Sequence, residues 1–163
     1  MIFVVVGTQE PFDRLIKIVD EWAVQSGYND IIAQVSNANY LPANFKHFDF
    51  LPTDKFDELF KKAEIIVGHA GMGTIISAMH YQKPIIVMPR LAKFREHRND
   101  HQLATAKSFS QLGYVRSVYS KDELIVALNE RNLLKPAPPI SEHASTGLLE
   151  TIENFFIKNT ISN

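Results

Sequence analysis

The chain has 163 residues, of which 45% are hydrophobic and 21% are charged, and its formal net charge at pH 7 is −1. This length and balance are typical of one globular domain with a substantial core, and the near-zero charge argues against a nucleic-acid partner. The absence of cysteine excludes disulfides and thiolate metal sites.

The N-terminal part of the chain alternates short apolar runs with an amphipathic segment. Residues 2–6 are predicted to form a buried strand rather than a signal peptide, because no basic region precedes them and the run stops at Gly7. A helix is then indicated by apolar residues that recur with a helical period: Phe12, Leu15, Ile16, Val19, Trp22 and Ala23. A second strand is predicted over 31–35, a loop rich in Asn and Pro over 36–46, and a short strand over 48–51.

The same alternation continues through the middle of the chain. A helix is predicted to start at Thr53 or Asp54, either of which can cap it, and to run to about Ala63. The elements that follow are a strand over 64–67, a helix over 73–81, a strand over 85–88, a charged loop over 89–98, a helix over 99–112, a short strand that starts at 114–115 and a helix over 121–129 capped by Ser120. Strands that alternate with helices predict an α/β fold, a Rossmann-like doubly wound parallel sheet.

Prolines divide the C-terminal part from the rest. We expect a domain over 1–131, a proline-containing linker over 132–145 and a helix over 146–159. The apolar stripe of this helix can either dock on a partner or pack back on the sheet of its own chain. No apolar stretch approaches the roughly 20 residues that a membrane-spanning helix needs, so membrane association is expected to come through a surface or a partner.

A glycine-flanked turn over 68–74, with the sequence GHAGMGT, lies between a predicted strand and a predicted helix. Gly71 and Gly73 lack the Cβ atoms that keep a ligand away from the backbone. Free N–H groups and the positive end of a helix dipole favour a phosphate at such a turn. The alternative is a tight connection that needs glycine for packing. Neither the dinucleotide-binding spacing nor a Walker loop is present.

Polar residues follow several of the predicted strands, in loops that should meet at the carboxyl edge of the sheet. The loops are 7–10, the stretch around 51–53, the glycine turn and 89–102. His69 can contact a diphosphate or a sugar hydroxyl, or it can be a structural histidine. Arg90 and Arg95 can neutralise a leaving diphosphate, or they can simply be solvated.

His97 and His101 are four residues apart, a spacing that can hold a metal ion if both lie on one helix face. Asp100 or Glu96 can supply a third ligand. This pattern keeps a metal-dependent hydrolase open as an alternative function. The competing interpretation is a polar loop that leads into a helix capped by Asn99 or Asp100.

Three segments together resemble a known family: 6–15, the GHAGMGT turn over 68–74, and 89–102 with its EHRNDHQ run. They are similar to glycosyltransferase family 28 C-terminal domains. The resemblance is greatest to the short bacterial exopolysaccharide subunits of the PssE and EpsF type, and to the cytosolic subunit of the dolichol-linked GlcNAc transferase. It covers roughly residues 2–118.

The resemblance implies the C-terminal, donor-binding half of a GT-B fold. It further implies a UDP-sugar-binding, catalytic subunit of a two-chain inverting glycosyltransferase (a hexosyltransferase) that acts on a lipid-linked acceptor in polysaccharide biosynthesis. A membrane-anchored partner subunit would supply the other half and the catalytic base, so the chain would be cytoplasmic and peripheral at the inner face of the membrane. No cofactor or metal is expected. A non-catalytic nucleotide-binding subunit is a further alternative.

The family's motifs, together with the residues discussed above, give the predicted donor-binding set. It consists of Thr8, Leu51, Gly71, Met72, Gly73, Thr74, Arg90, His101 and Gln102. Candidate catalytic residues on this chain are His69, Glu96 and His97. Ser77 stands where similar proteins have a glutamate for the ribose hydroxyls. This departure puts GlcNAc as the transferred sugar in doubt and favours the exopolysaccharide group.

Overall fold

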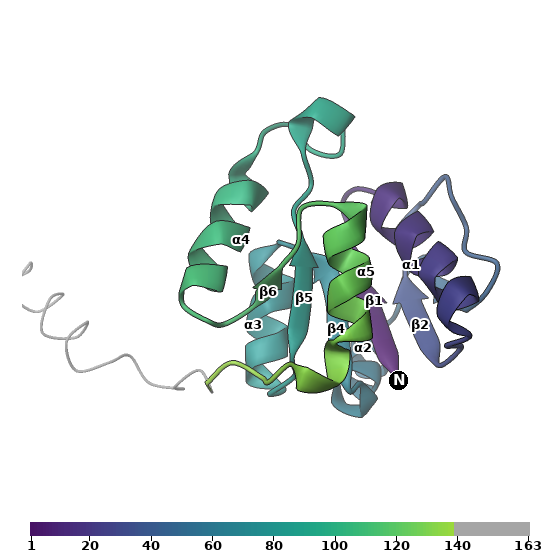
Figure 1. Cartoon of the computed structure of the whole chain (residues 1–163). Coiled ribbons are helices and arrows are strands. Elements are labelled where there is room, and N and C mark those ends of the chain that lie inside the picture. Colours follow the sequence, from purple (N-terminus) through teal and green to yellow (C-terminus); the bar gives the residue numbers. More distant parts are fainter. Residues whose placement is uncertain (139–163) are drawn as a thin grey trace, which may run out of the picture.

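Six short parallel strands form one sheet in the computed structural model, which describes residues 1–138 (Figure 1). The strands are β1 (Ile2–Val5), β2 (Ile31–Gln34), β3 (Lys46–Phe48), β4 (Ile65–His69), β5 (Ile85–Met88) and β6 (Arg116–Ser117). Their order across the sheet is β3-β2-β1-β4-β5-β6. The winding direction therefore reverses between β1 and β4, which confirms the predicted doubly wound, Rossmann-like sheet.

Helices cover both faces of this sheet. They are α1 (Asp13–Ser26), α2 (Thr53–Lys62), α3 (Met72–His80), α4 (His101–Gln111) and α5 (Lys121–Asn129), with short 3-10 turns η1 (Ala92–Phe94) and η2 (Arg131–Leu133). Figure 1 shows α5 in front of the sheet and α2 and α3 behind it. Alternate residues of β1 enter the two cores, Ile2 and Val4 on the α1 and α5 side and Phe3 and Val5 on the other. A strand buried on both faces is apolar throughout, as the sequence of β1 indicates.

The two edge strands differ from their predicted positions. β3 covers 46–48 rather than 48–51, and β6 covers 116–117 and so begins after its predicted start at 114–115. Both strands are short and mostly polar, so their position depends on pairing with β2 and β5 rather than on an apolar pattern. β4 is longer than predicted, because Gly68 and His69 still pair with β5.

The helix caps agree with the sequence in one case and differ in another. Ser120 caps α5, since its side chain accepts a hydrogen bond from the Glu123 N–H. The capping of α2 by Thr53 or Asp54 is wrong: Pro52 occupies the N-cap position and makes no side-chain cap.

The described part of the predicted linker starts with η2 and continues to residue 138 without regular structure. Ala137 is buried in the core behind the sheet, and its carbonyl accepts a hydrogen bond from Gln82. The domain boundaries remain predictions, and the predicted helix over 146–159 lies outside the described residues. Within residues 1–138, no helix is long and apolar enough to span a membrane.

A buried carboxylate organises the loop that follows β2. Asp20 of α1 is only 3% exposed, and it accepts hydrogen bonds from the Tyr40 hydroxyl at 2.7 Å, the Ala43 N–H at 3.1 Å and the Asn44 N–H at 3.0 Å. Burial by itself would raise the pKa of Asp20, but these hydrogen bonds outweigh burial and hold the pKa below its ordinary value. The predicted loop is therefore an ordered segment tied to α1.

Replacing Asp20 by Asn is expected to lower the free energy of unfolding at pH 7 by about 2 kcal/mol, because an amide N–H₂ then faces backbone donors. The folded-state pKa of Asp20 is depressed, so its contribution is complete above the unfolded-state pKa and is lost as the pH falls through the folded-state pKa. Urea unfolding across this range measures both effects. Asp13→Asn, which changes a half-buried carboxylate on the same helix that, within residues 1–138, accepts hydrogen bonds only from Asn39, is the control. Equal losses in the two variants would contradict the role given to Asp20.

Candidate functional site

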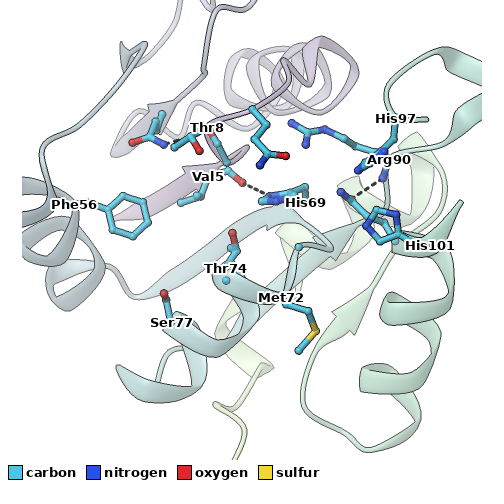
Figure 2. Close-up of a pocket in the computed structure, with 16 residues that line it drawn as sticks. Val5, Thr8, Phe56, His69, Met72, Thr74, Ser77, Arg90, His97 and His101 are labelled. Atoms are coloured by element: carbon cyan, nitrogen blue, oxygen red, sulfur yellow. Dashed lines mark hydrogen bonds between the residues drawn. The ribbon is translucent and has the colours of Figure 1, made fainter. Parts of the chain in front are cut away.

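A cavity of about 490 Å³ opens where the winding of the sheet reverses, beyond the carboxyl ends of β1 and β4 (Figure 2). Ligands of open α/β sheets bind at this place. The lining residues are Val5, Gly7, Thr8, Gln9, Gln34, Phe56, His69, Gly71, Met72, Gly73, Thr74, Ser77, Arg90, His97, His101 and Gln102. None of these sixteen residues is acidic, so the lining suits an anion.

The first turn of α3 presents unpaired amides to this cavity. Gly71 is the N-cap residue, and its carbonyl accepts the hydrogen bond from the Ile75 N–H. Among the hydrogen bonds of residues 1–138, none uses the N–H groups of Met72, Gly73 or Thr74 as donors. A Cβ atom placed on Gly73 would meet nothing within 4 Å. Three donors and the helix dipole are thus available to a phosphate.

Gly71 has a different role from Gly73. A Cβ atom on Gly71 would lie 2.1 Å from Nε2 of His69, so this glycine makes room for the imidazole rather than for a ligand. Gly7 bounds the ring on another side, since its Cβ would lie 3.0 Å from Cε1 of His69. Gly68 also serves packing, because a Cβ there would lie 2.7 Å from the Val5 carbonyl oxygen. The packing explanation therefore applies to Gly68 and Gly71, whereas the space beside Gly73 is open and its role toward a ligand remains a prediction.

His69 is neutral at pH 7. Burial, followed by the charge of Arg90, lowers the pKa of His69 to about 4. Its Nδ1 lies 3.4 Å from the Val5 carbonyl oxygen, which can only accept, so the proton is assigned to Nδ1 (Figure 2). Nε2 then carries a lone pair.

Arg90 provides a buried positive charge at the cavity. Its side chain is 3% exposed, its Nη2 donates to the carbonyl oxygens of Val6 at 2.7 Å and of Glu10, and its Nε has no partner. No carboxylate forms an ion pair with Arg90 in the described part of the chain. Burial lowers the pKa of this guanidinium. Gln102 accepts a hydrogen bond from the Arg90 main-chain N–H at 3.2 Å, so the two predicted residues are brought together.

The rings of His97 and His101 meet at the cavity, with centroids 4.5 Å apart and planes at 89° (Figure 2). His97 precedes α4, so the two residues do not share a helix face as the metal alternative requires. His97 Nδ1 accepts from the Arg98 N–H at 2.7 Å, and His101 Nδ1 lies 2.5 Å from Asn99 Oδ1. Burial, followed by the nearby His101, lowers the pKa of His97.

The proposed third metal ligands have other partners. Asp100 accepts from the Ala92 N–H at 2.8 Å, and Glu96 is held by Arg14 at 2.6 Å. No group of three or more potential ligands from His, Cys, Asp and Glu occurs in residues 1–138. The metal-dependent hydrolase alternative therefore gains no support from this arrangement.

Three predicted residues lie outside the cavity lining. Leu51 lines a neighbouring hollow between β3 and α2, and Arg95 and Glu96 lie on the loop after β5, where Arg95 is exposed and Glu96 pairs with Arg14. Gln34 was missed by the sequence analysis, although it bridges the cavity wall: its Oε1 accepts from the Leu51 N–H at 3.1 Å, and its Nε2 donates to the Gly7 carbonyl at 3.3 Å. The available signal was a buried glutamine at the carboxyl end of an apolar strand. Phe56 was missed as well.

Comparisons with known proteins agree with the resemblance seen in the sequence. The family described as Glycosyltransferase family 28 C-terminal domain matches residues 1–154. The UDP-N-acetylglucosamine transferase subunit ALG13 of Homo sapiens is 30% identical over 124 residues, which cover 70% of this chain and 10% of that protein. Across the curated relatives, the chain spans between 10% and 44% of their length.

Solved structures show the same fold. The solution structure of ALG13 superimposes with a TM-score of 0.60 at 22% identity, over 87% of this chain and 90% of that one. Os79 from O. sativa, determined in complex with UDP, superimposes with a TM-score of 0.59 at 15% identity, over 79% of this chain and 31% of that one. These likenesses confirm the predicted half of a GT-B fold.

Proposed function

Because the chain belongs to the glycosyltransferase family 28 C-terminal domains, we propose a function for it within that family. It is the UDP-sugar-binding, catalytic subunit of a two-chain inverting glycosyltransferase. The observation that carries this proposal is the first turn of α3, where unpaired amides face a cavity without acidic residues. The pyrophosphate of a UDP-sugar matches these donors in charge and in the number of acceptors.

The shape of the cavity orients the donor. Phe56 and Ser77 lie at one end, His97 and His101 at the other, and Thr74 lies between them (Figure 2). With the pyrophosphate at Thr74, the aromatic end accommodates the nucleoside and the histidine end the sugar. In this pose Leu51 can contact the uracil through its carbonyl oxygen, since Gln34 already engages its N–H.

Ser77 bears on the identity of the donor sugar. Ser77 offers one hydroxyl to the ribose, where a glutamate offers two oxygens. The exopolysaccharide preference drawn from this difference gains no support from the curated relatives compared, whose names specify UDP-N-acetylglucosamine. UDP-GlcNAc is therefore the first donor to test.

Transfer of the sugar builds negative charge on the leaving UDP. The α3 amides and the guanidinium of Arg90 stabilise that charge. They lower the activation barrier only if they bind the departing UDP in the transition state more tightly than they bind the intact donor. The cavity lacks a carboxylate, so we place the base that deprotonates the acceptor on the partner chain, with His69 and His97 as candidates on this one. Glu96 is a poor candidate because Arg14 holds its carboxylate.

The proposed enzyme includes a second subunit. A GT-B enzyme needs a second Rossmann-like half, and we propose that a membrane-anchored partner subunit supplies it. The acceptor is then a lipid-linked sugar, and the chain lies in the cytoplasm, peripheral at the inner face of the membrane through that partner.

Calorimetric titration of the full chain tests the donor site. UDP is expected to bind, and uridine is expected to bind at least about tenfold more weakly, because it lacks the phosphates that the α3 amides would hold. A folded chain that binds no UDP at millimolar concentration would refute the proposal. Reconstitution with the membrane partner and radiolabelled UDP-GlcNAc then tests catalysis. UDP binding without transfer from any UDP-sugar would favour the non-catalytic alternative.

A further inference from the structure

Two sequence motifs that are far apart in the chain meet in an ion pair beside the cavity. Arg14, in the first turn of α1, and Glu96, in the loop between β5 and α4, form two hydrogen bonds: Nε to Oε1 at 2.6 Å and Nη2 to Oε2 at 2.8 Å. The side chains are 22% and 10% exposed. This bidentate geometry in a largely buried place is stronger than a surface pair.

Arg14 also holds the start of the loop that contains Glu96. Its Nη1 donates to the sulfur of Met88 at 3.1 Å, and its Nη2 donates to the Pro89 carbonyl at 3.1 Å. The guanidinium lies 5.2 Å from the ring centroid of Phe12 and 5.0 Å from that of Phe94. One side chain of α1 therefore fixes both the beginning and the middle of this loop.

Glu96 closes the loop on itself. Its Oε2 accepts from the Leu91 N–H at 3.0 Å, and its own N–H donates to the Leu91 carbonyl at 3.4 Å. The loop between β5 and α4 contains no regular structure other than the short turn η1. Arg90 anchors the start of this loop to Val6 and Glu10, and the contact with Arg14 anchors the part that contains Glu96.

We propose that Arg14 and Glu96 are positioning residues that hold His97 and His101 against the sugar of the bound donor. This inference rests on the proposed function. His97 follows Glu96 directly, and its ring meets that of His101 at the cavity, whereas neither Arg14 nor Glu96 lines the cavity. The pair therefore acts through the loop. Hydrogen bonds to a sugar require such placement, because small displacements of a side chain remove them.

Glu96→Gln tests this role in the full chain, with affinities measured by calorimetry for UDP and for four donors: UDP-GlcNAc, UDP-glucose, UDP-galactose and UDP-glucuronate. We follow whichever donor the wild-type chain binds most tightly. Its affinity relative to that of UDP is expected to fall about tenfold in the variant, the value of one or two hydrogen bonds. The affinity for UDP itself should not change, because Met72, Gly73 and Thr74 are unaffected.

The matched control is Glu21→Gln, which breaks the ion pair of Lys121 and Glu21. That pair also joins α1 to a distant segment at 2.6 Å, but neither residue lines the cavity. Glu21→Gln should change neither the affinity for UDP nor that for the UDP-sugar. Arg14→Lys keeps the charge but not the bidentate contact, so its relative affinity for the UDP-sugar should fall by an intermediate amount. This second variant tests the role of the pair even if Glu96→Gln folds poorly.

Two results would overturn the inference: equal losses for UDP and for the UDP-sugar, or no loss for either, in variants whose thermal unfolding matches the wild type. A wild-type chain that does not bind UDP would instead refute the proposed function. The double variant Arg14→Gln/Glu96→Gln should lose less relative affinity than the sum of the two single losses, because the two changes share one contact.

Discussion

Gly73→Leu is expected to lower the affinity for UDP at least about 100-fold while the chain stays folded. Gly73 lies in the first turn of α3 and lines the cavity, and nothing lies within 4 Å of the position of a Cβ atom there. A leucine side chain therefore fits without a clash inside the protein, but it occupies space that a pyrophosphate would need in order to reach the amides. Leucine also favours the helix over glycine, so stability should not fall.

Calorimetry measures the loss of binding, and thermal unfolding checks the fold. Gly73→Ala is the matched variant, because it makes the same backbone change with a single methyl group. It should bind UDP more weakly than the wild type and more tightly than Gly73→Leu. If Gly73→Leu binds UDP as the wild type does, the α3 amides are not the donor site.

The central part of the fold was predictable because its signals are local. β1, β2, β4 and β5 coincide with β-branched runs, and the helical stripe of α1 matches its buried face. The edge strands were not predictable in this way. Lys46 in β3 and Arg116 in β6 are exposed polar residues, and only their pairing with a neighbouring strand places them in the sheet.

Part of the candidate site was predictable for the same reason. The turn over 68–74 is contiguous, and chain order places it at the carboxyl edge of the sheet. The contacts that link distant segments were invisible: Gln34 joins the loop after β1 to Leu51, and Glu96 pairs with Arg14 across 82 positions. No local spacing marks such pairs, so Glu96 was interpreted as a candidate catalytic residue.

The two inner glycines of the turn have different surroundings, which the sequence alone does not distinguish. Both Gly71 and Gly73 fit the expectation of a backbone opened to a phosphate. The structure separates them, because the space beside Gly71 holds the imidazole of His69, whereas the space beside Gly73 is open. The His69 ring is closely surrounded, since a Cβ atom on Gly7 would also lie 3.0 Å from its Cε1 and the Val5 carbonyl faces its Nδ1.

Gly71→Ala should therefore lower the free energy of unfolding by about 3 kcal/mol, because the added methyl group would lie 2.1 Å from Nε2 of His69 and the ring or the turn must shift. Truncating the ring should relieve this clash. The double variant His69→Ala/Gly71→Ala is expected to be more stable than Gly71→Ala alone, although His69→Ala by itself removes buried contacts and destabilises the chain. Urea unfolding of the four proteins in this cycle gives the coupling energy. Strictly additive losses would mean that Gly71 does not make room for His69.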